Sequence, residues 1–153
     1  MINILYLDDS RIALKVMERD LKSYAKVTTA ASIKEAEKAI KEQEFNAFIL
    51  DYMLDDGTGI DFARFIRQIP KFETTPIVLI SAGLTINIEY LAMRYGINKS
   101  LKKPVKSEEL KKIINELLES PKIHAVERPH LNLSCIVGRQ MAVIMNIRRM
   151  SIN

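Results

Sequence analysis

The stretch INILYLDD, residues 2–9, decides the fold class, because a short apolar run ends abruptly at two aspartates. Two further runs have the same form: FNAFILD, residues 45–51, and PIVLIS, residues 76–81. Each is apolar nearly throughout instead of alternating with polar residues, which is typical of strands buried on both faces of a parallel sheet. Each also ends at a polar side chain. The runs therefore predict a buried parallel sheet with functional groups at the strand ends.

Amphipathic segments separate these runs and predict helices, because apolar residues recur in them at helical spacing. The expected helices are residues 10–23, a segment from 33, residues 60–69, residues 87–95 and a segment from 107. The expected strands are residues 2–7, 25–29, 45–50, 76–80 and 98–103. Ser32 and Glu35 match a capping box at the second helix. This alternation predicts an α/β fold, a doubly wound five-stranded parallel sheet with five helices, over residues 1–119.

The residues that end the strands carry the functional prediction. In a parallel sheet the carboxyl ends of the strands meet at one edge, where ligands bind. The residues expected there are Asp8, Asp9, Asp51, Ser81 and Lys103. Each of them alone is more typical of a turn, a helix cap or a solvated surface, and only their joint occurrence is informative.

Three carboxylates brought together repel each other, and a divalent cation relieves that repulsion. Hard oxygen ligands suit Mg²⁺. One carboxylate can then act as a nucleophile toward phosphorus, while a lysine ammonium and a serine hydroxyl stabilise the charge on the transferred group. Asp55, Asp56 and Asp61 are assigned to the loop and helix start, with no role in this chemistry.

The sequence resembles the receiver domain of two-component response regulators over roughly residues 1–119. The matching pieces are LDDS (7–10), DYML (51–54), DGTG (56–59), ISA (80–82) and KP (103–104). The family has a flavodoxin-like receiver fold. The resemblance implies that a histidine kinase or phosphotransfer protein phosphorylates Asp51.

The same resemblance assigns roles to the other site residues. It implies that Asp8, Asp9, Asp51 and the backbone carbonyl of Met53 arrange Mg²⁺. It also implies that Ser81 and Lys103 contact the phosphoryl oxygens. By this resemblance the chain is a phosphoryl acceptor in signalling and not an independent metabolic enzyme.

Two positions depart from the family pattern. Ser100 stands where an aromatic residue usually couples phosphorylation to output, three positions before the lysine. Tyr90 and Tyr95 on the neighbouring helix are candidates to replace it, although core packing or surface exposure is the favoured interpretation of both. Asp55 stands where many members have proline. The sequence therefore supports the phosphoryl-acceptor site better than the usual switch.

Residues 120–153 form a short C-terminal extension. They carry five basic residues against Glu127 alone, which accounts for the net charge of +4 of the 153-residue chain. A single cysteine, Cys135, excludes an intramolecular disulfide. With no apolar stretch long enough to span a bilayer and no targeting signal, a cytoplasmic protein without a membrane partner is expected.

Two alternatives stay open. The missing aromatic residue motivates a constitutive interaction or dimerisation module, in which Asp51 phosphorylation is not coupled to output. The basic extension motivates DNA binding, although five dispersed charges are equally typical of a solubilising segment, so a nucleic-acid partner is not favoured.

Overall fold

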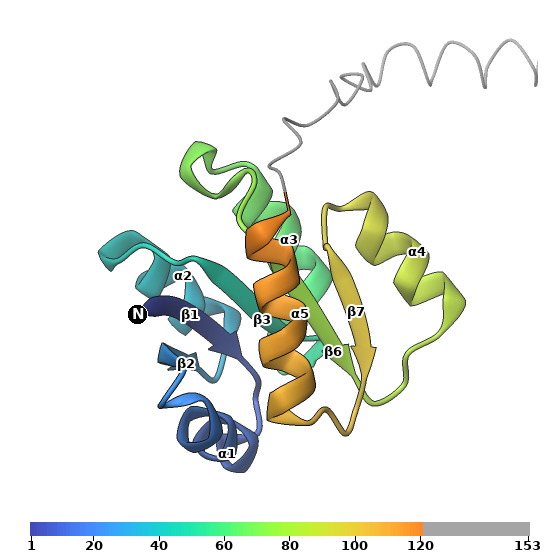
Figure 1. The fold of residues 1–153 in the computed structure, drawn as a ribbon. Helices are drawn as coiled ribbons and strands as arrows, with labels where there is room; N and C mark the ends of the chain where they lie inside the picture. The colour runs from blue at the N-terminus through green and yellow to red at the C-terminus, as the bar shows by residue number, and fades with distance from the viewer. Residues whose placement is uncertain (121–153) are drawn as a thin grey trace, which may run out of the picture. The chain divides into compact units, whose positions relative to one another are not determined.

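The computed structural model describes residues 1–120, whose main element is a five-stranded sheet (Figure 1). All neighbouring strands pair in parallel, in the spatial order β2-β1-β3-β6-β7. The strands are β1 (Ile2–Leu7), β2 (Ala25–Ala30), β3 (Ala47–Asp51), β6 (Ile77–Ser81) and β7 (Lys99–Lys102). Counted along the chain these five run 2-1-3-4-5, so the direction of winding reverses between β1 and β3. The predicted doubly wound sheet is confirmed.

Helices cover both faces of the sheet, and each face has its own apolar core. The helices are α1 (Arg11–Leu21), α2 (Ile33–Glu42), α3 (Gly59–Arg67), α4 (Ile86–Arg94) and α5 (Ser107–Glu119), with a 3₁₀ turn η1 (Pro70–Phe72). Side chains from α1 and α5 pack on one face, and those from α2, α3 and α4 pack on the other. Figure 1 shows α5 in front of the sheet and α3 behind it. The five predicted helices are therefore present.

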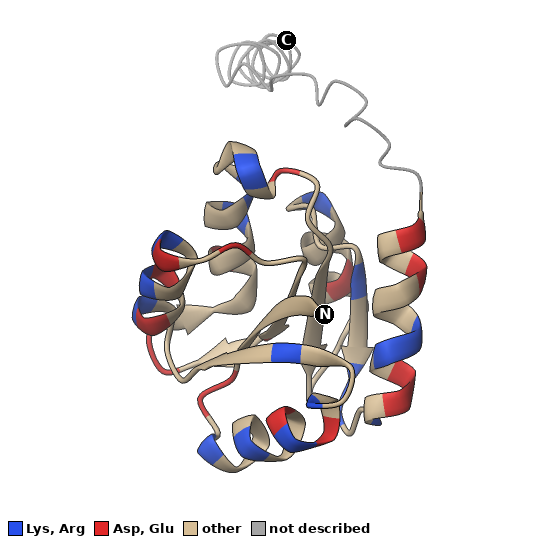
Figure 2. Ribbon diagram, turned by 60° about the vertical axis from the view of Figure 1, so that its left-hand side comes forward, with Lys and Arg blue, Asp and Glu red and all other residues tan. Residues whose placement is uncertain are grey.

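The central strands carry almost no charge. Across β1, β3 and β6, Asp51 is the only charged residue. Figure 2 shows the Lys, Arg, Asp and Glu residues mainly on helices and loops. An acidic group on a central strand needs a specific partner, because burying an unpaired charge is costly. The strand ends are therefore where the fold tolerates charge.

The loop after β3 forms a small hairpin that the sequence predicts only as a turn. Strand β4 (Met53–Leu54) pairs antiparallel with β5 (Gly57–Thr58). Gly57 has a φ of 151°, a conformation that residues with a side chain rarely adopt. Asp56, in the turn, accepts hydrogen bonds from the backbone N–H groups of Ile33 (3.1 Å) and Lys34 (3.2 Å) at the start of α2. The Asp51 loop is thus tied to a neighbouring helix.

The predicted capping box at Ser32 is only half correct. The Ser32 hydroxyl accepts the N–H of Glu35 at 3.1 Å, as a cap should. The Glu35 carboxylate, however, accepts the N–H of Ala31 at 2.8 Å, one residue before the cap. The reciprocal pair forms instead at α3, between Thr58 and Asp61. Asp61 therefore has the helix-start role predicted for it.

One helix face differs from the pattern of apolar residues in the sequence. On α1, Leu14 and Leu21 are buried, but Ile12 is 78% exposed and Val16 is 41% exposed.

In the part of the chain that the structure describes, no helix is both long and apolar enough to cross a membrane.

Candidate functional site

The predicted site residues lie at the carboxyl end of the sheet, around the point where the winding reverses. Asp8 and Asp9 follow β1, while Asp51 and Ser81 are the last residues of β3 and β6. Lys103 follows β7. A pocket of about 350 Å³ opens here, and its lining is Asp9, Asp51, Tyr52, Met53, Ser81, Ala82, Gly83 and Lys103. The structure thus brings together the side chains that were predicted from their positions at the strand ends.

Three carboxylates form the acidic part of the site. One oxygen from each of Asp8, Asp9 and Asp51 lies within 4.8 Å of the other two. Asp8 is fully buried and Asp51 is 7% exposed, whereas Asp9 is partly exposed. Oxygens around an octahedral Mg²⁺ are about 3.0 Å apart when adjacent and about 4.2 Å apart when opposite, given a bond length of about 2.1 Å. The three carboxylate oxygens are therefore near the spacing that this ion needs and would draw closer together around it.

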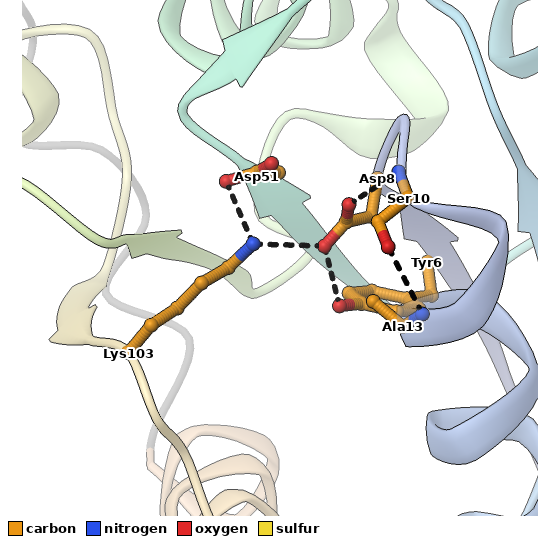
Figure 3. A network of polar contacts seen from close by, with 6 residues as sticks. All are labelled: Tyr6, Asp8, Ser10, Ala13, Asp51 and Lys103. Atoms are coloured by element: carbon orange, nitrogen blue, oxygen red, sulfur yellow. Dashed lines mark hydrogen bonds and ion pairs between the residues drawn. The ribbon is translucent and has the colours of Figure 1, made fainter.

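The Lys103 ammonium lies between two of these carboxylates, as Figure 3 shows. Its Nζ is 3.0 Å from Asp8 Oδ2 and 3.3 Å from Asp51 Oδ1. The Lys103 backbone N–H donates to the Ser81 carbonyl oxygen at 2.9 Å, which holds the base of this side chain beside β6. The Lys103–Pro104 peptide bond is cis. A cation thus already offsets part of the acidic cluster.

Burial and mutual repulsion change the acidity of these groups. Burial, and then the charge of Asp8, raise the pKa of Asp51 above its usual value, although Lys103 opposes this. Burial, followed by the charges of Asp55 and Asp8, raises the pKa of Asp9. Burial lowers the pKa of Lys103, but the hydrogen bond and charge of Asp8 outweigh it, so the net shift is upward. The site therefore makes Asp51 and Asp9 weaker acids and keeps Lys103 charged.

We expect Asp51 to make the metal-free protein less stable as pH rises. Because the pKa of Asp51 is raised in the folded state, its contribution to stability is complete below the pKa of the unfolded state, about 3.9. That contribution is lost as pH rises through the pKa of the folded state. The measurement is urea unfolding in EDTA at several pH values, for the wild type and Asp51→Asn. The wild type should lose stability relative to the variant with rising pH. A relative gain would contradict the assigned shift.

Tyr6 is a site residue that the sequence analysis missed. It is 2% exposed, and its phenol donates to Asp8 Oδ2 at 2.8 Å. The signal was present, because residues two apart on a strand point to the same face and Tyr6 precedes Asp8 by two. Burial, and then Asp8, raise the pKa of Tyr6, so the phenol remains a donor at neutral pH.

Gly59 is a second missed position. A Cβ added there would collide with the backbone carbonyl oxygen of Asp51 and would lie 2.9 Å from Leu79 Cδ1. The Gly59 N–H also donates to the Tyr52 carbonyl at 2.9 Å. The start of α3 therefore packs directly on the backbone of the acidic residue, and only glycine leaves room for this approach.

Ser100 and the two tyrosines considered as replacements for the missing aromatic residue differ in their surroundings. Ser100 is partly buried on β7, opposite Leu79 of β6. Tyr90 is 52% exposed, and its hydroxyl accepts from Arg94 at 3.2 Å. Tyr95 packs against the core, with the Arg64 guanidinium 4.7 Å from its ring centre. Neither tyrosine lines the pocket. Cys135 and the rest of the extension lie outside the described residues.

Comparison with known proteins identifies the family. Residues 4–115 match the family model of the response regulator receiver domain. The chain belongs to the response regulator receiver family. A receiver of this family is a component of two-component signalling. The acidic cluster and the lysine at the ends of the parallel strands lie within the matched residues.

Curated relatives are distant but consistent. Response regulator protein PilR of Pseudomonas aeruginosa is 28% identical over 101 residues, which cover 66% of this chain and 22% of PilR. Two-component response regulator ARR7 of Arabidopsis thaliana is 28% identical over 124 residues, covering 73% of this chain and 60% of ARR7. The receiver thus matches less than two thirds of either protein. A 14.6 kDa protein of Leptolyngbya boryana is 29% identical, with 74% and 88% coverage.

Solved structures agree on the fold. Chemotaxis protein CheY4 of Vibrio cholerae superposes with a TM-score of 0.73 at 24% identity, covering 76% of this chain and 98% of CheY4. A response regulator structure from Chloroflexus aurantiacus gives a TM-score of 0.71 at 28% identity, with 76% and 97% coverage. The flavodoxin-like receiver fold predicted for the chain is therefore confirmed.

Proposed function

We propose that the receiver accepts a phosphoryl group on Asp51 from a histidine kinase or phosphotransfer protein, with Mg²⁺ as cofactor. The observation that carries the proposal is the cluster of Asp8, Asp9 and Asp51 with Lys103 at the carboxyl end of the sheet, where all but the buried Asp8 line one pocket. This set combines a nucleophile with the positive charge that a phosphoryl group needs.

The transfer is a simple displacement at phosphorus. An Asp51 carboxylate oxygen forms the new P–O bond, and the bond between phosphorus and the donor atom breaks. The donor leaves with that electron pair, and Asp51 becomes an aspartyl phosphate. Lys103, now 3.3 Å from Asp51, would contact a phosphoryl oxygen, and the Ser81 hydroxyl would donate to another.

Asp8, Asp9, Asp51 and the Met53 carbonyl are the groups proposed to hold Mg²⁺. The three carboxylates fit because their oxygens are hard ligands that are already close together. Met53 lines the same pocket. Bound Mg²⁺ would neutralise negative charge on the carboxylates and on the incoming phosphoryl group.

Removal of the metal tests this assignment. With acetyl phosphate as donor, we expect EDTA to slow phosphorylation by about 100-fold or more, because a metal supplies several kcal/mol of charge stabilisation. The rate of phosphoprotein formation, followed by intact-protein mass spectrometry, measures this. Added excess Mg²⁺ should restore the rate. An unchanged rate in EDTA would reject the metal role.

The proposed output of the receiver is a change in protein interaction on phosphorylation. A second copy of the chain, in a homodimer, is one proposed partner. We also propose that residues 1–119 form the receiver, that residues 120–153 form an extension, and that the protein is cytoplasmic. A sizing measurement with and without acetyl phosphate distinguishes a switch from the constitutive module that Ser100 motivates.

A further inference from the structure

The Asp8 carboxylate has a partner that the proposed function does not use. Its Oδ2 is shared by two donors, the Tyr6 phenol at 2.8 Å and the Lys103 ammonium at 3.0 Å. Its Oδ1 accepts the Ser10 backbone N–H at 2.8 Å. Figure 3 shows Tyr6 and Lys103 reaching the same oxygen from different directions. An ionised carboxylate has about four acceptor positions, so three are taken and one on Oδ1 is open.

Two of these three donors belong to the scaffold around β1. Tyr6 is fixed by its burial in the core under α1 and α5, and Ser10 is the N-cap of α1. Each holds a different oxygen of Asp8, so together they set the plane of the carboxylate. Lys103 is different, because its side chain is 31% exposed and would turn to the phosphoryl group in the proposed reaction.

We propose that Tyr6 is a positioning residue for the Mg²⁺ site, holding the Asp8 carboxylate in the orientation that leaves its open Oδ1 position available to the metal. The proposal rests on the proposed metal site. Tyr6 does not touch the reacting atoms. It acts through Asp8, in the way that outer-shell partners orient metal ligands elsewhere.

Loss of the phenol weakens Mg²⁺ binding for two reasons. The carboxylate plane would be held by Ser10 alone on the scaffold side. In addition, Lys103 would become the only donor to Oδ2, and the stronger ion pair would compete better with the metal. The Oδ2 lone pair that the phenol occupied would then strengthen the ion pair with Lys103, which already contacts that oxygen.

The chain provides a matched control. Tyr24 also donates a phenol hydrogen bond, to Asn115 Oδ1 at 2.7 Å, and it joins the region after α1 to α5. Tyr24→Phe therefore deletes the same group as Tyr6→Phe, without a contact to the acidic cluster. Tyr6→Phe keeps the buried ring, and Asp8 keeps Lys103 and Ser10, so the variant should fold.

The test is isothermal titration calorimetry of Mg²⁺ without a phosphodonor, on the wild type and both variants. We expect Tyr6→Phe to raise the apparent Kd about tenfold, at the low end of the effect of outer-shell partners, and Tyr24→Phe to change it by less than about twofold. In Tyr6→Phe the Mg²⁺ concentration needed for half-maximal phosphorylation should rise in parallel. The fold-increase in that concentration should be larger than the fold-decrease in the phosphorylation rate at saturating Mg²⁺.

Two results would overturn the inference alone: an unchanged Mg²⁺ affinity in Tyr6→Phe, or an equal loss in Tyr24→Phe. A wild-type protein that binds no Mg²⁺ would instead overturn the metal site and the inference with it. The three outcomes are distinct, because each appears in a different protein of the same titration series.

Discussion

Asp51→Asn should abolish phosphorylation by acetyl phosphate and Mg²⁺. Asparagine has nearly the shape of aspartate, but its amide is neutral and does not attack phosphorus. The substitution also removes a negative charge from a crowded acidic cluster, so the fold should be at least as stable at neutral pH. Intact-protein mass spectrometry should find the added phosphoryl group on the wild type and none on the variant.

The control for this variant is another aspartate changed in the same way. Asp20 lies on α1, away from the pocket, and pairs with Arg19 at 2.8 Å. Asp20→Asn should be phosphorylated at the wild-type rate. If Asp51→Asn were labelled as fully as the wild type, the phosphoryl group would be going to another residue, and the assignment of Asp51 would be wrong.

Gly59→Ala should destabilise the receiver, although alanine is normally the better helix former. The new Cβ would enter the space of the Asp51 carbonyl oxygen, which is backbone and cannot rotate away. Overpacking of this kind costs about 1–3 kcal/mol, against a gain of about 1 kcal/mol from replacing glycine in a helix. Because the collision is with backbone, we expect the upper part of that range and a net loss of up to about 2 kcal/mol in urea unfolding. Phosphorylation should also slow, because the strain acts on the backbone that carries the nucleophile.

Gly83→Ala is the matched control for this substitution. Nothing lies within 4 Å of a Cβ built at Gly83, and its backbone does not require glycine. Its free energy of unfolding should stay within about 0.5 kcal/mol of the wild-type value. Equal stability of the two variants would show that the close approach at Gly59 carries no cost.

Most of the fold and the site's main residues could be predicted from sequence. A short apolar run that ends at a charged residue predicts a buried strand that ends at the sheet edge, and parallel strands bring such ends together. For this reason Asp8, Asp51 and Ser81 could be located without coordinates. The resemblance to the receiver family then supplied roles that spacing alone does not define, such as that of the Met53 carbonyl, which stays a proposal.

Contacts between distant segments could not be predicted. Asp56 binds the start of α2, more than twenty positions earlier in the chain, and no spacing rule indicates such a partner. Arg67 donates to the carbonyls of Phe72, Thr75 and Gly96, because a long guanidinium reaches wherever the fold leaves acceptors. Exposure also depends on neighbours, and Ile12 is exposed despite its apolar side chain.

Locating the phosphoryl group chemically is the most direct test of the central claim. Borohydride reduces an aspartyl phosphate to homoserine, which peptide mass spectrometry assigns to one position. After treatment of the wild type with acetyl phosphate and Mg²⁺, the account predicts homoserine at position 51, with Asp8 and Asp9 unchanged. Homoserine at either of those neighbours and not at position 51, or a phosphoryl group that resists borohydride, would contradict it.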